Sequence, residues 1–174
     1  VIEGLFAAGH EIVEIWYGSG SATLKPSKQR RLERQIARKI ARLQKGRQFT
    51  FRDVGGTSHQ DRLALVDTLQ NVPGLVSAGS GIIFKQDFLD RFDVAVNFHP
   101  AMLPDYRGPH PLQALVLRGD ADRFGGMTMH LLAVGIDEGA IVAQQHIPRS
   151  SARHSLDWRL KLSAAAGRMA RDDL

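Results

Sequence analysis

The feature that most constrains the fold is an apolar segment that ends in an amide and an imidazole. Residues 94–98 read Val-Ala-Val-Asn-Phe, and His99 and Pro100 follow directly. Such a run is typical of a strand buried on both faces of a parallel sheet. Asn97 and His99 are two residues apart, so they share one face of that strand. Pro100 cannot donate to a sheet ladder and ends the strand, so we expect both side chains at its carboxyl end, where open α/β sheets bind ligands.

Strand and helix patterns alternate along the rest of the 174 residues. Further strands are expected at 10–17, 48–54, 127–134 and 140–147, and residues 75–84 are expected to be a strand that runs into a glycine-bearing loop. Helices are expected at 27–45, 57–70, 86–92, 111–119 and 155–171. This alternation predicts an α/β fold with a doubly wound, mostly parallel, Rossmann-like sheet. The chain opens on the end of a helix and closes on two acids that oppose a helix dipole. We therefore expect residues 1–174 to be one domain that lacks a first strand and is incomplete at both ends.

Composition limits the classes of protein to consider. The chain has no cysteine, which excludes disulfides and thiolate chemistry for this sequence. It contains no apolar run of membrane-spanning length and no secretory signal pattern, so we expect a cytoplasmic protein without a membrane partner. The net charge of +5 favours anionic partners.

The expected helix at 27–45 is strongly basic on the side opposite its apolar stripe. Its basic residues are Arg30, Arg31, Arg34, Arg38, Lys39, Arg42 and Lys45. One interpretation is an ordinary solvated face, and another is a surface that contacts phosphates, to which the preceding Lys25 would add. No aromatic side chains are interleaved, so base stacking is not indicated.

Four polar residues follow strands or end them, and they allow three interpretations. Asn97, His99, His130 and Asp137 could be ordinary buried or turn residues. Two histidines and a carboxylate could bind iron or zinc, although their spacing matches no metal motif. The third interpretation is acid–base acyl transfer without a covalent intermediate. In it Asn97 donates to an oxyanion, His99 carries a proton, and Asp137 orients the imidazole and raises its pKa.

Two separated motifs resemble the signature of the folate-dependent formyltransferases. Residues 97–108, Asn-Phe-His-Pro-Ala-Met-Leu-Pro-Asp-Tyr-Arg-Gly, follow the family pattern Asn-x-His-Pro-(small)-x-Leu-Pro with a glycine a few residues later. Residues 126–130, Gly-Met-Thr-Met-His, resemble its Gly-x-Thr-x-His strand, and residues 137–142, Asp-Glu-Gly-Ala-Ile-Val, its Asp-x-Gly-x-Ile/Leu turn. The motifs occur in the family's order, and the resemblance covers residues 75–148 best.

The resemblance implies transfer of a formyl group from 10-formyltetrahydrofolate, a folate co-substrate, to a primary amine without a metal. By carry-over, Asn97, His99 and Asp137 would be the catalytic residues, with His130 in support. The residues that match the family's pterin-binding loop and turn are Ile82, Ile83, Phe84, Gly135 and Ile136.

The amine acceptor is less constrained by the resemblance. Lys25, the basic helix, Arg107 and Gly108 resemble the methionyl-tRNA branch of the family, which implies a tRNA partner. Amino sugar nucleotides are the other favoured acceptors. The glycinamide ribonucleotide branch fits less well, because its phosphate-binding first strand is not in this chain and Ala101 stands where serine is common. Two alternatives remain: hydrolysis of 10-formyltetrahydrofolate with water as nucleophile, and a basic RNA-binding module without catalysis.

Overall fold

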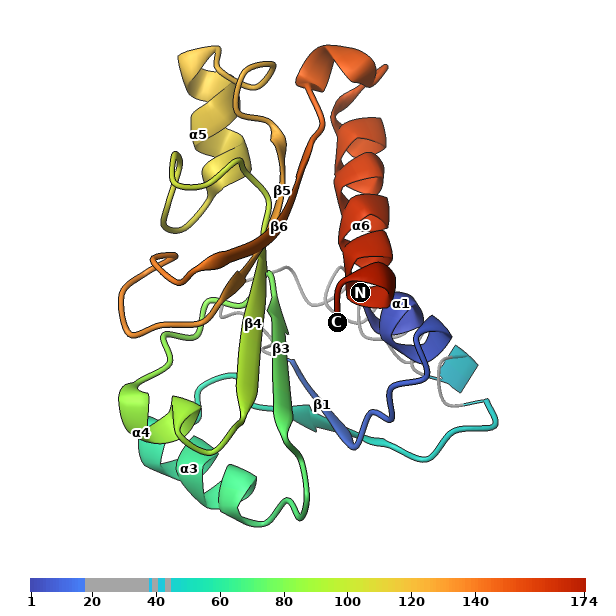
Figure 1. The fold of residues 1–174 in the computed structure, drawn as a ribbon, viewed down its shortest axis with the longest axis vertical. Coiled ribbons are helices and arrows are strands. Elements are labelled where there is room, and N and C mark those ends of the chain that lie inside the picture. The colour runs from blue at the N-terminus through green and yellow to red at the C-terminus, as the bar shows by residue number, and fades with distance from the viewer. Residues whose placement is uncertain (18–37, 39–40, 43–44) are drawn as a thin grey trace, which may run out of the picture. The chain divides into compact units, whose positions relative to one another are not determined.

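The computed structural model describes residues 1–17, 38, 41–42 and 45–174 (Figure 1). They belong to two compact units, one within residues 12–68 and the other formed by residues 1–11 and 69–174, and we describe each by itself. The expected basic helix lies almost wholly outside the described residues, and so does Lys25. Within the described part of the chain, no helix combines the length and hydropathy needed to cross a membrane.

The smaller unit is built on a pair of parallel strands. β1 (Glu14–Tyr17) pairs residue by residue with β2 (Thr50–Asp53). α3 (His59–Asp67) begins at a capping box, in which the Ser58 hydroxyl accepts from the N–H of Asp61 and the Asp61 carboxylate accepts from the N–H of Ser58. This reciprocal pair satisfies two helix-end groups and sets the start of the helix.

The larger unit contains a four-stranded sheet in the order β3-β4-β5-β6. Its strands are β3 (Gly74–Ala78), β4 (Val94–His99), β5 (Gly126–Leu131) and β6 (Ile141–His146). β3 and β4 run parallel, whereas β5 is antiparallel to both of its neighbours. The α/β class is confirmed. Parallel pairing joins β1 to β2 and β3 to β4, while the short connection between β5 and β6 permits only an antiparallel pair.

Proline and glycine set the limits of the helix that follows β4. α5 (Pro111–Arg118) has proline at its first position, where a missing N–H leaves no bond unmade. Gly119 closes it with a φ of 75°, a left-handed conformation that glycine adopts without a steric penalty. The predicted helix at 111–119 is therefore confirmed almost to the residue.

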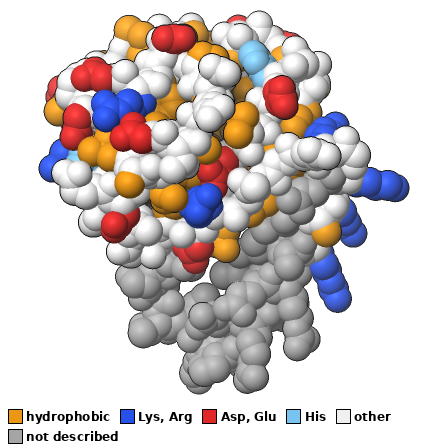
Figure 2. All heavy atoms as spheres, turned by 90° about the horizontal axis from the view of Figure 1, so that it is seen from below, with side chains coloured by type: hydrophobic (Ala, Val, Ile, Leu, Met, Phe, Trp, Pro, Cys, Tyr) orange, Lys and Arg blue, Asp and Glu red, His pale blue; other side chains and the backbone are white. Residues whose placement is uncertain are grey.

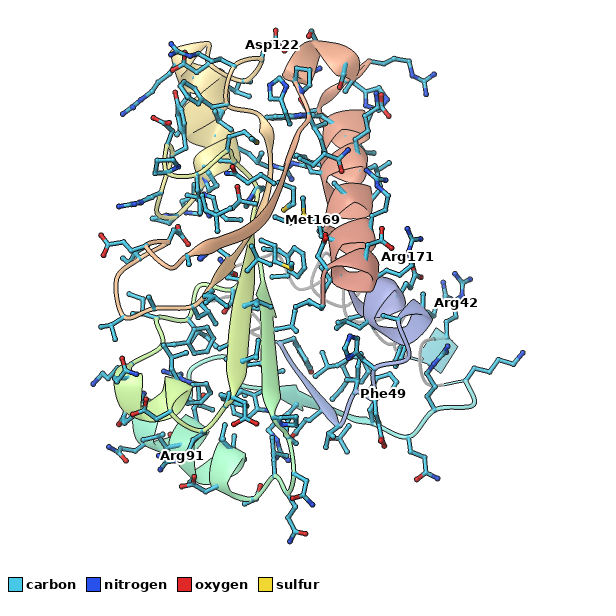
Figure 3. The ribbon with its side chains drawn as sticks, viewed as in Figure 1. Arg42, Phe49, Arg91, Asp122, Met169 and Arg171 are labelled. Carbon is cyan, nitrogen blue, oxygen red and sulfur yellow. The ribbon has the colours of Figure 1, made fainter. Side chains whose placement is uncertain are left out.

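The remaining helices of the larger unit are α1 (Ile2–Ala7), α4 (Gln86–Leu89), the 3₁₀ turn η1 (Arg149–Ser151) and α6 (Ser155–Asp172). α6 packs on β5 and on α1, and Met169 lies between α6 and the sheet (Figure 3). The backbones of α1 and α6 come so close that a Cβ added to Gly4 would lie 2.0 Å from the carbonyl oxygen of Gly167. Only glycine at position 4 therefore allows this helix contact.

Candidate active site

The register of β4 against β5 brings the polar motif residues together. Asn97 lies opposite His130, and His99 lies opposite Thr128. Residues directly opposite each other in an antiparallel pair point to the same face, with Cβ atoms about 5 Å apart. The two motifs, residues 97–108 and 126–130, therefore supply an amide and two imidazoles to one surface of the sheet.

The amide of Asn97 is oriented by His130. Nδ2 of Asn97 lies 3.1 Å from Nε2 of His130, and Nδ1 of His130 lies 2.8 Å from the carbonyl oxygen of Leu131. The carbonyl can only accept, so the hydrogen bonds assign the proton to Nδ1 and leave Nε2 to accept from Asn97. His130 is only 1% exposed, so the pair is fixed, and the second N–H of the Asn97 amide remains able to donate elsewhere.

Asp137, in the turn between β5 and β6, lies close to both histidines. Its Oδ2 lies 3.3 Å from Nδ1 of His99, and its Oδ1 lies 3.5 Å from Nε2 of His130. The same carboxylate accepts a 2.8 Å hydrogen bond from the backbone N–H of Gly108. Asp137 has a φ of 53°, a left-handed conformation that aspartate tolerates better than most residues and that clusters at functional sites.

His99 is buried and held at both ring nitrogens. It is 4% exposed, with Nδ1 beside Asp137 and Nε2 2.9 Å from the carbonyl oxygen of Tyr106. Burial lowers the pKa of His99, while the Asp137 charge and the bond to Tyr106 raise it and His130 lowers it. The net pKa is below the ordinary value. The expectation that the carboxylate would raise it is therefore wrong in net effect, because desolvation outweighs the charge.

The lowered pKa of His99 makes stability depend on pH. As pH falls, the unfolded chain protonates this histidine near 6.5, whereas the folded protein does so only at lower pH. Between those two values the unfolded state binds more protons, so stability rises with pH there and is lost as pH falls. We expect the free energy of unfolding, measured with urea at about pH 7.5 and about pH 5.5, to drop more for the wild type than for His99→Gln. An equal drop in the two proteins would contradict the burial argument.

A hydrogen-bond network around the buried Thr128 side chain holds the loop that follows β4. The Thr128 hydroxyl donates to the carbonyl of Ala101 at 2.6 Å and accepts from the N–H of Leu103 at 3.2 Å. The Gln144 amide donates to the same hydroxyl at 2.9 Å and to the carbonyl of Leu103 at 2.8 Å. Linked hydrogen bonds of this kind rigidify their surroundings. Thr128 and Gln144 thus hold the start of the loop from the two neighbouring strands, a role that the sequence analysis missed.

The turn that carries Asp137 requires glycine at its end. A Cβ on Gly139 would lie 1.7 Å from the carbonyl oxygen of Leu131, which is backbone and cannot rotate away. We expect Gly139→Ala to lower the free energy of unfolding by about 1–3 kcal/mol or more, measured by chemical denaturation. Gly81→Ala is the matched control, because a Cβ there meets nothing within 4 Å. Equal stability of the two variants would show that the turn relaxes.

The residues expected at the pterin ring do not all face the same way. The side chains of Ile83 and Ile136 are 65% and 52% exposed. Phe84 instead turns into the core, where its ring stacks on Phe88 at a centroid distance of 5.2 Å. Ile82 and Gly135 are half-buried.

The two residues expected near the acceptor differ in what they contact. Arg107 is exposed, with Nη1 3.5 Å from the carboxylate of Glu138, the residue after Asp137. Gly108 has a φ of 92° and gives its N–H to Asp137, so its backbone belongs to the polar cluster. Among the described residues, no group of three His, Asp or Glu side chains is arranged to hold a metal ion.

Comparison with known proteins adds family information to this geometry. Residues 23–158 match the family model described as formyl transferase. A methionyl-tRNA formyltransferase from Borrelia recurrentis is 41% identical over 99 residues, which are 56% of this chain and 31% of that protein. The chain thus spans about a third of the length of the curated relatives it matches.

Solved structures show the same fold at low sequence identity. Phosphoribosylglycinamide formyltransferase from Bacillus halodurans aligns with a TM-score of 0.69 at 19% identity, over 98% of this chain and 84% of that one. A sugar N-formyltransferase from a Shewanella species aligns with a TM-score of 0.57 at 19% identity, over 94% and 68%. Since the family model covers well over half of the sequence, the chain belongs to the formyl transferase family.

Proposed function

We propose that this chain transfers a formyl group from 10-formyltetrahydrofolate to the primary amine of methionyl-tRNA. The observation that carries the proposal is the convergence of Asn97, His99 and Asp137 on one face, with His130 between the amide and the carboxylate. An amide donor, an imidazole and a carboxylate in contact are what direct acyl transfer needs. Membership of the formyl transferase family supports formyl transfer as the reaction, and the relatives about 40% identical support methionyl-tRNA as the acceptor.

The reaction needs no covalent enzyme intermediate. The amine nitrogen attacks the formyl carbon and forms a C–N bond, the carbonyl electron pair moves to oxygen, and a tetrahedral intermediate results. Return of that pair expels N10 of the folate, which takes up a proton, while the attacking nitrogen loses one. Tetrahydrofolate and the formylated amine are the products. The step that builds charge on oxygen is the one the protein can stabilise most.

Each cluster residue has a separate task in this scheme. The free N–H of the Asn97 amide donates to the developing oxyanion, and His130 keeps that amide in orientation. His99 moves the proton between the two nitrogens through its Nδ1, directly or through water, because its Nε2–H donates to the Tyr106 carbonyl. Its lowered pKa keeps a large neutral fraction at neutral pH that can accept the proton. Asp137 stabilises the imidazolium that then forms.

The folate donor would lie against exposed apolar side chains of the larger unit. Ile83 and Ile136 offer apolar surface to a flat ring, and the Gly135 backbone offers polar groups for its edge. Gly81, Ile82 and Ile83 belong to the segment between β3 and α4, in which the N–H of Ile82 is bonded to the Ser80 hydroxyl at 3.0 Å. The Phe84 side chain, packed on Phe88, would anchor this segment in the core instead of touching the ring.

The acceptor assignment is supported mainly by sequence. The two curated Borrelia relatives, each 41% identical to this chain over 99 residues, are named methionyl-tRNA formyltransferase. The net charge of +5 suits a polyanionic acceptor. In the view of Figure 2 acidic and basic side chains are interspersed over much of the described surface, and a group of Lys and Arg side chains projects from one edge. Lys25 and Arg107 remain predicted contacts of the acceptor.

The test is an acceptor screen with the full chain. We expect tetrahydrofolate to form with methionyl-tRNA, with the label of [¹⁴C]formyl donor recovered on the methionine. Recovery of the label on an amino sugar nucleotide instead would move the acceptor to that class. Tetrahydrofolate formation at the same rate with no amine would show that water is the nucleophile and that the chain is a hydrolase. Steeply salt-dependent tRNA binding that Asn97→Ala and His99→Ala leave intact, with no turnover of the donor, would favour the RNA-binding module.

A further inference from the structure

The side chain of Tyr106 contacts residues other than His99, the residue that its backbone carbonyl contacts. Its hydroxyl donates to the Asp120 carboxylate, and its ring packs against Phe124 at a centroid distance of 5.5 Å. The Arg118 guanidinium lies over the same ring, 5.8 Å from its centroid. Neither the family motifs nor the proposed reaction gives this tyrosine a task, yet three contacts hold it.

The other end of the residue touches the catalytic imidazole. The carbonyl oxygen of Tyr106 lies 2.9 Å from Nε2 of His99, opposite the Nδ1 contact with Asp137. Tyr106 has a φ of 58°, a conformation that is costly for an aromatic residue and persists only where the surroundings hold it. Tyr106 thus contacts His99 through its backbone carbonyl and Asp120 through its hydroxyl.

The position of Asp120, which accepts the Tyr106 hydroxyl, is fixed by backbone hydrogen bonds. It follows the glycine that ends α5, and its N–H donates to the carbonyl of Leu115 at 3.0 Å. Its own carbonyl accepts from the N–H groups of Arg123 and Phe124 at 3.0 and 2.9 Å. The end of α5 and the turn after it thus hold Asp120 through bonds that do not involve Tyr106.

We propose that Tyr106 is a positioning residue for His99: the bond from its hydroxyl to Asp120 fixes the loop so that its carbonyl holds Nε2 of the imidazole. The proposal rests on the proposed function for the task of His99, but the contact itself can be measured without turnover. The titratable groups that face His99 are Asp137 from the β5–β6 turn and His130 from β5. Asp120 is not among them, so we expect a change at Asp120 to act on His99 through Tyr106.

The test is an NMR titration of His99 in the full chain, with labelled histidine. The hydrogen bond to Tyr106 raises the pKa of His99 against the larger effect of burial, so losing it lowers that pKa further. We expect a lower pKa in Tyr106→Phe and in Asp120→Ala, and no further fall in the double variant. Asp120→Asn should behave as the wild type, because its amide oxygen still accepts the hydroxyl. Tyr17→Phe, at the only other tyrosine, is the matched control.

Activity gives the second readout. In Tyr106→Phe and Asp120→Ala the acid limb of the pH–rate profile should move to lower pH with the titration, and kcat/KM should fall about threefold to tenfold, the usual worth of one hydrogen bond. An unmoved His99 titration in both variants, even with a lower melting temperature, would make the tyrosine merely structural and overturn the proposal. If the wild type shows no formyl transfer, the proposed function fails while the titration still decides the contact. Should Tyr106→Phe not fold, the Asp120→Ala and Asp120→Asn pair makes the same comparison.

Discussion

Asn97→Ala is expected to lower kcat by about 10²–10³, with a small effect on the KM for the folate donor. Removing one preorganised donor to a developing oxyanion has this cost in other acyl-transfer sites. The amide is preorganised here because His130, itself bonded to the Leu131 carbonyl, holds Nδ2 at 3.1 Å. Steady-state kinetics with saturating acceptor measure the effect.

Charge and shape at this position can be separated with a second substitution. Asn97→Asp keeps the size of the side chain but replaces the N–H donor with an oxygen, so it should be at least as inactive as the alanine variant. Asn71→Asp, at the only other asparagine in the chain, makes the same chemical change on an exposed residue and should retain full activity. An active Asn97→Asp enzyme would remove the amide from the catalytic scheme.

Asp137→Asn should lower kcat by about 10²–10⁴, the range over which positioned acid–base groups act. The variant retains an oxygen for the N–H of Gly108, so the turn should keep its shape. What is lost is the negative charge 3.3 Å from Nδ1 of His99. Because that charge raises the pKa of His99, its removal lowers the pKa further, and any acid limb of the pH–rate profile should move to lower pH.

A matched control is available outside the cluster. Asp122, labelled in Figure 3, also accepts a backbone N–H, that of Ser150 near the start of α6. Asp122→Asn should leave kcat and the pH–rate profile unchanged. If Asp137→Asn lost activity without any change in the titration of His99, the carboxylate would act by holding the loop at Gly108 and not through the imidazole.

Local chemistry explains which parts of the fold were predictable. The end of β4 at His99 follows from Pro100, and the limits of α5 follow from Pro111 and Gly119, because these residues act through their own backbone. The direction of β5 does not follow in this way. It depends on how the segment after α5 returns to the sheet, which is decided by tertiary packing, so an alternating pattern could not distinguish parallel from antiparallel pairing.

In the candidate site, too, some features could be predicted from the sequence and others could not. Asn97, His99, His130 and Asp137 were named from residue type and motif, and the structure brings these four together. The sign of the pKa change at His99 was not available, because it depends on how fully the imidazole is desolvated relative to one nearby charge. The carbonyl of Tyr106 was also missed, since every residue has a carbonyl and sequence gives no signal for where one points.

The loop after β4 contacts the site residues through its backbone and exposes several of its side chains. The Tyr106 carbonyl and the Gly108 N–H serve His99 and Asp137, while the side chains of Asp105 and Pro109 are exposed. Main-chain groups persist through substitution, so the exposed positions can change in evolution without moving the imidazole or its carboxylate. Substitutions at Asp105 and Pro109 can thus change the exposed surface of this loop while the backbone contacts to His99 and Asp137 are inherited intact.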